Sequence, residues 1–316
     1  MSNKKRTVIG LAATIVITIH IINKIQYSIA VGKDLLTSTE NQYFEWRFGK
    51  IRYTRKGSGN PVLLLHGLHV GSSEAEFHKI KDELSKHHEV FTFDLLGYGL
   101  SDKPNITYTG YLYVQLIIDF VKNIIGKRTD IIVSGDSSSL ALIASLNDTE
   151  IFNRIVLINP QNNNEANRIP NKRAKARKLF FDTPILGTFG YLLLTSKASL
   201  KRRFEKYYFS NPYNIEEKDI EKYLEASHVP DHSSKYAFAC QTGNYLNTNF
   251  IHALKETNNS ILVLSGKGKK DAEEIANNYS QLNPAIEISY VKNTKQLPHL
   301  EKPEEVVAQV SIFLES

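Results

Sequence analysis

The stretch TDIIVSGDSSSLALIASL, residues 129–146, decides the fold. Ile131-Ile132-Val133 is a continuous apolar run, which is typical of a strand buried on both faces of a sheet. Leu140 to Leu146 is an apolar segment of helical length. The small residues between them predict a tight strand-to-helix turn. Within this turn Gly135-x-Ser137-x-Ser139 places small residues on both sides of a serine, so we expect the Ser137 hydroxyl to project above the sheet at the helix N-terminus.

The same alternation of strand and helix continues on both sides of this stretch. Further buried strands are predicted at Val62–Leu65, Val90–Leu95, Ile155–Ile158, Ile261–Leu264 and Ile286–Val291. Helices are predicted around 77–84, at 111–125 and at 306–314, and a leading hairpin at 44–53. This alternation predicts an α/β domain over residues 40–316, with a mostly parallel central sheet flanked by helices.

Residues from about 160 to 250 break the alternation with basic and aromatic helical segments. We interpret them as a helical cap inserted over the carboxyl ends of the strands, where open α/β sheets bind ligands. The net charge of +6 and the absence of a nucleic-acid motif predict no nucleic-acid partner. The single Cys240 and the lack of HxxxH or HExxH spacing predict no metal, and we expect no cofactor.

The first thirty residues predict a membrane-inserting segment. Lys4, Lys5 and Arg6 precede an uncharged run from Thr7 to Ile22. We interpret residues 1–30 as an uncleaved signal-anchor, with a cleaved signal ending at Ser28-Ile29-Ala30 as the alternative. The basic residues before the run place the N-terminus in the cytoplasm and the domain on the extracytoplasmic side. We therefore expect a membrane-anchored, single-pass protein.

A serine at such a turn is a candidate nucleophile for acyl transfer. The intermediate of that reaction needs two amide donors facing its oxyanion. The residue after the nucleophile, Ser138, would supply one amide, and Leu68 after His66-Gly67 would supply the other.

Four motifs follow one another in a fixed order along the chain. They are 65–67 (Leu-His-Gly), 94–104 (Asp-Leu-Leu-Gly-Tyr-Gly-Leu-Ser-Asp-Lys-Pro), the turn at 135–139, and 297–304 (Leu-Pro-His-Leu-Glu-Lys-Pro-Glu). Together they resemble the α/β-hydrolase superfamily, in the branch with lipase-, haloperoxidase- and epoxide-hydrolase-like members. The likeness runs from about Phe44 to the C-terminus and is weakest in the cap. It implies a serine-nucleophile hydrolase of ester or similar acyl substrates.

Two positions depart from the family pattern. Lys269 stands where the resemblance implies the acid, and Gln296 stands where it implies the histidine. Glutamine cannot accept a proton from serine near neutral pH. His299 is the candidate displaced base and Asp271 the candidate displaced acid. Histidines of the cap are further alternatives for the base: His228, His232 and His252.

The predicted cap carries a dense set of basic residues. They favour contact with anionic lipid near the anchor, or they form solvated helix faces; the sequence leaves both open. The residues are Arg168, Lys172, Arg173, Lys175, Arg177, Lys178, Lys197, Lys201, Arg202 and Arg203.

Two hypotheses of function remain. The first is a membrane-anchored serine hydrolase with Ser137 as nucleophile. The second is a catalytically degenerate hydrolase fold that binds a small apolar ligand or a partner beneath the basic cap.

Overall fold

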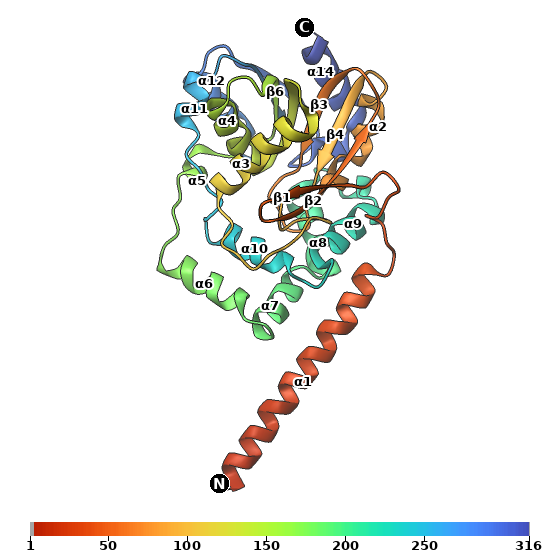
Figure 1. The fold of residues 1–316 in the computed structure, drawn as a ribbon, viewed down its shortest axis with the longest axis vertical. Coiled ribbons are helices and arrows are strands. Elements are labelled where there is room, and N and C mark those ends of the chain that lie inside the picture. The colour runs from red at the N-terminus through yellow and green to blue at the C-terminus, as the bar shows by residue number, and fades with distance from the viewer. Residues whose placement is uncertain (1–2, 316) are drawn as a thin grey trace.

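The computed structural model describes residues 3–315, and the side chains of residue 14 and of residues 16–315. These residues build one eight-stranded sheet in the order β1-β2-β4-β3-β5-β6-β7-β8 (Figure 1). β2 pairs antiparallel with β1 and with β4, and every other pairing is parallel. The strands are β1 (Gln42–Trp46), β2 (Gly49–Lys56), β3 (Asn60–Leu65), β4 (His88–Phe93), β5 (Thr129–Ser134), β6 (Phe152–Ile158), β7 (Ser260–Gly266) and β8 (Glu287–Val291).

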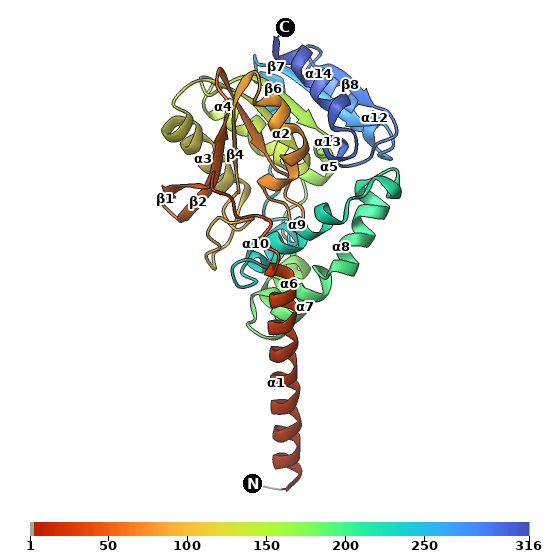
Figure 2. The same cartoon turned by 90° about the vertical axis from the view of Figure 1, so that its right-hand side faces the viewer.

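Alternate side chains of the central strands enter two separate cores. On one face Leu63, Leu65 and Ile131 pack against α3 and α4, and α11 and α12 complete this layer. On the other face Val62 and Leu64 pack with α2 and α14 (Figure 2). The flanking helices are α2 (His78–Leu84), α3 (Gly110–Phe120) continued by the π-helical turn η2 (Val121–Ile125), α4 (Ser138–Asn147), α11 (Ile251–Glu256), α12 (Ala272–Leu282) and α14 (Pro303–Glu315).

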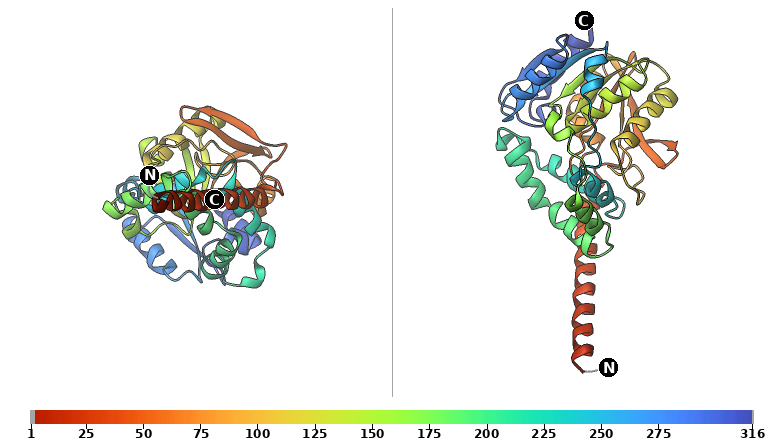
Figure 3. Two further views of the ribbon diagram at one scale, coloured as in Figure 1. Left: turned by 90° about the horizontal axis from the view of Figure 1, so that it is seen from below. Right: turned by 90° about the vertical axis from the view of Figure 1, so that its left-hand side faces the viewer.

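The chain between β6 and β7 is helical and lies at one end of the sheet (Figure 3). Its core is aromatic, with Tyr191, Phe204, Tyr208 and Tyr223 buried together. Asparagine and serine side chains cap several of these helices, as Asn171 does by accepting from the Ala174 amide. The elements are α5 (Asn163–Ala166), α6 (Lys172–Asp182), α7 (Leu186–Leu194), α8 (Lys197–Arg203), η4 (Phe204–Tyr208), η5 (Pro212–Asn214), α9 (Glu217–His228) and α10 (Ser234–Thr242).

The N-terminal helix α1 (Asn3–Val31) extends away from the domain, and its C-terminal part packs on the cap (Figure 2). Asn23 is buried, and the Tyr27 ring packs edge-on against His232 with centroids 5.2 Å apart. Ala30 belongs to the aromatic core of the cap. The end of α1 is therefore an integral part of the domain's packing.

The expectation of a membrane anchor in residues 1–30 is wrong. Among the residues that the structure describes, no helix is long and apolar enough to cross a membrane. Polar residues interrupt the second half of α1, including Asn23 and Lys24, and this half contacts the cap instead. The side chains of Lys4, Lys5 and Arg6, on which the expected orientation rested, lie outside the described residues. The expected single-pass, extracytoplasmic placement of the domain rested on this anchor and is wrong as well.

The expected contact between the basic cap and anionic lipid depended on that anchor and is also withdrawn. Several of these basic side chains pair with carboxylates of the domain itself. Lys178 lies 2.7 Å from Asp182, and Lys197 lies 2.5 Å from Glu217. Such pairing is typical of solvated helix faces.

The segment after α1 is fastened to α9 by two carboxylates, Glu221, which pairs with Lys33 at 2.6 Å, and Glu225. Glu225 accepts the amides of Leu35 at 2.7 Å and Leu36 at 3.3 Å. We predict that Glu225→Ala speeds hydrogen exchange of both amides about tenfold, because each loses its acceptor. Exchange measured by NMR checks this. The control is Glu217→Ala. Glu217 lies on the same helix but pairs with Lys197, so its loss should leave the exchange rates of the Leu35 and Leu36 amides unchanged. Equal protection in Glu225→Ala would contradict the assignment.

Candidate functional site

The turn between β5 and α4 is sharpest at Gly135. This residue follows β5 directly and has a φ of +57°, in the left-handed region that favours glycine. The short helix η3 (Gly135–Ser137) then leads into α4. Ser137 has φ −67° and ψ −12°, an ordinary right-handed helical conformation. The strained position of the turn therefore lies two residues before the serine that the sequence pattern selected.

Ser137 faces the interior of the protein. Its side chain is fully buried, and its hydroxyl donates to the carbonyl of His66 at 2.7 Å. Among the described residues no histidine nitrogen is hydrogen-bonded to this hydroxyl. The bond instead ties the β5–α4 turn to the loop after β3. This placement gives Ser137 a structural contact where the sequence predicted an exposed nucleophile.

The pocket-facing position of the turn belongs to Gly135. A Cβ atom added there would lie 3.2 Å from Nε2 of His69 and 3.5 Å from Nε2 of Gln296. Gln296 is the residue that stands where the resemblance implies a histidine. The nucleophile of this fold projects from the strained residue of the turn. In this chain that residue has no side chain, and the groups opposite are the imidazole of His69 and the amide of Gln296.

Of the two predicted oxyanion donors, one is already bonded. The Ser138 amide donates to the carbonyl of Gly135, as expected inside a helical turn. The other donor, Leu68, lies in the loop after β3. His66 braces this loop: the His66 ring accepts a hydrogen bond from the Leu95 amide at 3.1 Å and contacts the Gly67 carbonyl at 2.7 Å. With Gly135 as the strained residue, the amide next to it is that of Asp136 and not that of Ser138.

The structure does not bring His299 and Asp271 together. His299 is fully buried, with Nε2 3.2 Å from Oε1 of Glu76 and its ring stacked on Phe77. Asp271 lies at a pocket rim with Lys269, 2.9 Å from its ammonium. Neither makes a hydrogen bond to Ser137 among the described residues. The displaced base and acid therefore have separate structural partners.

His69, Glu76 and Asn159 are site residues that the sequence did not reveal. Asn159 follows β6 and donates to the carbonyls of Lys295 at 2.7 Å and Gln296 at 2.9 Å, while accepting the Gly266 amide at 3.1 Å. It thereby fixes the loop that presents Gln296. A polar residue at the carboxyl end of a buried strand was a usable signal for Asn159. Glu76 gave none, because its partner His299 is distant in sequence.

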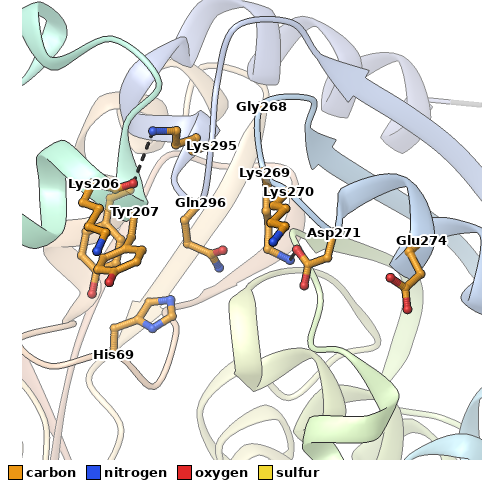
Figure 4. Close-up of a pocket in the computed structure, with 11 residues that line it drawn as sticks. His69, Lys206, Tyr207, Gly268, Lys269, Lys270, Asp271, Glu274, Lys295 and Gln296 are labelled. Atoms are coloured by element: carbon orange, nitrogen blue, oxygen red, sulfur yellow. Dashed lines mark hydrogen bonds and ion pairs between the residues drawn. The ribbon is translucent and has the colours of Figure 1, made fainter.

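An open pocket of about 650 Å³ lies beside Gly135, between the loops after β7 and β8 and the helix η4 (Figure 4). His69 and Gln296 face one another, with Lys269 and Asp271 to one side and Lys206 to the other. We call it the lysine pocket. Its lining is His69, Lys206, Tyr207, Tyr208, Gly268, Lys269, Lys270, Asp271, Glu274, Lys295 and Gln296.

The space directly beneath the cap is nearly filled. A cavity lined there by Tyr98, Tyr191 and Phe238 measures only about 10 Å³, which is about the room of a single water. The expected small apolar ligand beneath the cap has no room at this place. Within residues 3–315 no cluster of His, Cys, Asp or Glu side chains is placed to hold a metal ion.

Comparison with known proteins identifies the family. The model of the alpha/beta hydrolase family matches residues 62–310, and the chain belongs to this family. The fold class predicted from the sequence is confirmed: a mostly parallel sheet flanked by helices, with a helical insertion. A meta-cleavage product hydrolase from Pseudomonas fluorescens superposes with a TM-score of 0.69 at 17% identity, covering 87% of this chain and 97% of that one. An esterase from Thermogutta terrifontis gives 0.69 at 15% identity, covering 88% and 98%.

Curated relatives match a shorter part of the chain. A 2-hydroxy-6-oxo-6-(2'-aminophenyl)hexa-2,4-dienoic acid hydrolase of Metapseudomonas resinovorans is 34% identical over 110 residues, which is 34% of this chain and 38% of that protein. A 2-hydroxy-6-oxo-2,4-heptadienoate hydrolase of Pseudomonas putida is 28% identical over 104 residues, 32% of this chain and 38% of that protein. The chain thus matches well under half the length of these relatives.

The buried pair of Glu76 and His299 predicts a pH-dependent contribution to stability. Burial alone would raise the pKa of Glu76, but hydrogen bonding and charge attraction from His299, with attraction from His69, lower that pKa to about 2. A lowered carboxyl pKa stabilises the fold above the ordinary value of 4.5, and this stabilisation is lost as the pH falls toward 2.

We predict that Glu76→Gln lowers the free energy of unfolding by about 3 kcal/mol at pH 7, because His299 loses its buried partner. The difference from the native chain narrows below pH 4.5. Urea unfolding at several pH values measures both effects. Glu83→Gln, which removes an exposed pair with Lys86, is the control and costs less than about 1 kcal/mol. A difference that stays constant from neutral to acid pH would disprove the linkage.

Proposed function

We propose that this chain is a ligand-binding member of the alpha/beta hydrolase family that does not use a serine-histidine-acid relay. One observation carries the proposal: the strained residue of the nucleophile turn is Gly135, and the position its side chain would occupy lies 3.2 Å from Nε2 of His69 and 3.5 Å from the amide of Gln296, the residue at the family's histidine position. A glycine offers no atom to attack an acyl carbon. Glutamine cannot take the proton that such an attack releases.

The third position of the relay supports the same conclusion. Lys269 stands where the family resemblance implies a carboxylate, and its ammonium is paired with Asp271. A cation cannot orient and stabilise an imidazolium as the acid of a triad does. With nucleophile, base and acid all replaced, only binding and amide donors remain, which in related chemistry leave about 10³-fold acceleration over water.

Binding remains supported where catalysis is not. The pocket of about 650 Å³ lies within the size range of small-molecule sites, and its lining includes His69 and Gln296, the two side chains nearest Gly135. The relatives' names describe hydrolases, but the curated ones match only 38% of their own length. We therefore carry over the family's pocket position and not its reaction.

A fluorophosphonate probe tests the proposal. We predict that the folded native protein is not labelled, and that Ser137→Ala behaves identically, because its hydroxyl is buried against the His66 carbonyl. The triple variant Gly135→Ser, Gln296→His, Lys269→Asp restores the relay where the fold expects it and gains labelling. Mass spectrometry locates the adduct, and circular dichroism confirms folding.

Rapid labelling of the native protein at Ser137, lost in Ser137→Ala and in His299→Ala, would establish the serine hydrolase instead and would end the proposal.

A further inference from the structure

We propose that the lysine pocket binds a small organic anion whose oxyanion head, a carboxylate or a phosphate, lies between the lysines and the space above Gly135. This inference rests on the proposed binding function and adds the chemical class of the ligand. The observations that carry it are the uncompensated charge of the pocket, the donors at its inner end and the rigidity of its walls.

The pocket holds more positive than negative charge. Four lysines line it, against the carboxylates of Asp271 and Glu274. Only Lys269 has a carboxylate within ion-pair distance among the described residues, Asp271 at 2.9 Å. Lys295 donates to a backbone carbonyl at 3.3 Å, and the ammonium of Lys206 lies 5.1 Å from the centre of the Tyr207 ring.

Lysines elsewhere on the domain show the contrast. Lys79 lies 2.6 Å from Glu216, and Lys302 lies 2.5 Å from Glu305. Around the lysine pocket such pairing is largely missing from the described residues, so an anion that enters meets ammonium groups that no carboxylate neutralises. A pocket lined by one sign of charge raises the local concentration of the opposite ion.

The inner end of the pocket offers hydrogen-bond donors to an oxygen. The Gln296 side-chain nitrogen and Nε2 of His69 both face the place where a Cβ of residue 135 would stand. Nε2 of His69 is buried and has no hydrogen-bond partner. A buried polar atom of this kind normally has a partner, and an oxyanion can supply one.

The walls of the pocket are fixed before any ligand arrives. The Glu301 carboxylate accepts the amides of Ser210 and Asn211, each at 2.8 Å, and the amide of Lys295 at 3.2 Å. One buried carboxylate thus joins the chain after η4 to the loop after β8. Asn159 holds the same loop from the sheet side. In a preformed site of this kind, less binding free energy is lost to ordering loops and side chains when the ligand binds.

Three probes that share a phenyl ring and differ in head group test the ligand class: phenyl phosphate, benzoate and neutral benzyl alcohol. Calorimetric titration at low ionic strength gives the three dissociation constants. We expect at least one anion to bind about tenfold or more tightly than benzyl alcohol, as charge-assisted hydrogen bonds predict. Tighter binding of phenyl phosphate identifies a phosphate head, and tighter binding of benzoate a carboxylate head; both support the inference.

A matched pair of variants locates the site. Lys270→Gln with Lys295→Gln removes two pocket charges, and we expect it to weaken the anion about tenfold or more. Lys267→Gln changes an exposed lysine of the same loop that packs on Tyr290 outside the pocket, and should alter binding less than about twofold. Melting temperatures confirm that each variant is folded.

Two results would overturn the inference while leaving the proposed function standing: equal binding of all three probes, or equal weakening by the Lys267→Gln control. The proposed function itself is tested by a separate measurement, since fluorophosphonate labelling of the native protein would contradict it. The two failures therefore cannot be confused.

Discussion

The backbone conformation at the end of β5 is the constraint on which the account depends. The chain must leave a buried parallel strand and enter α4 within three residues, and it does so by a positive φ at Gly135. Ser137 is directed inward to the His66 carbonyl, and the Cβ position of residue 135 faces His69 and Gln296, which line the lysine pocket. The identity of the residue at this turn thus decides between a nucleophile and a binding site.

Several contacts hold the framework around the turn. His66 braces the loop after β3 through the Leu95 amide, and Asn159 fixes the loop that carries Gln296. Glu76 and His299 join the loop after β3 to the loop after β8 in the interior. These contacts stabilise the fold and the pocket walls alike. A family scaffold can therefore keep a well-defined pocket after the groups for proton transfer are replaced.

Much of the fold was predictable from the sequence, because buried parallel strands are continuous apolar runs such as Val62–Leu65 and Ile131–Val133. The site was predictable only in part. Lys269 and Gln296 were identified as departures, and both line the pocket. The register of the turn was not predictable: Ser134, Gly135 and Ser137 are all small, so the pattern alone could not locate the end of β5. The N-terminal helix was misjudged because its polar second half packs on the cap, a contact that hydropathy does not encode.

Thiol accessibility at the turn tests the central claim most directly, because the native Cys240 is buried. A cysteine placed at Gly135 should react rapidly with an aqueous thiol reagent, since its side chain would lie against His69 and Gln296, which line the open lysine pocket. A cysteine placed at Ser137, where the native side chain is fully buried, should stay protected until the protein unfolds. Rapid reaction at position 137 together with protection at position 135 would contradict the account, because the serine would then be the residue that faces the pocket.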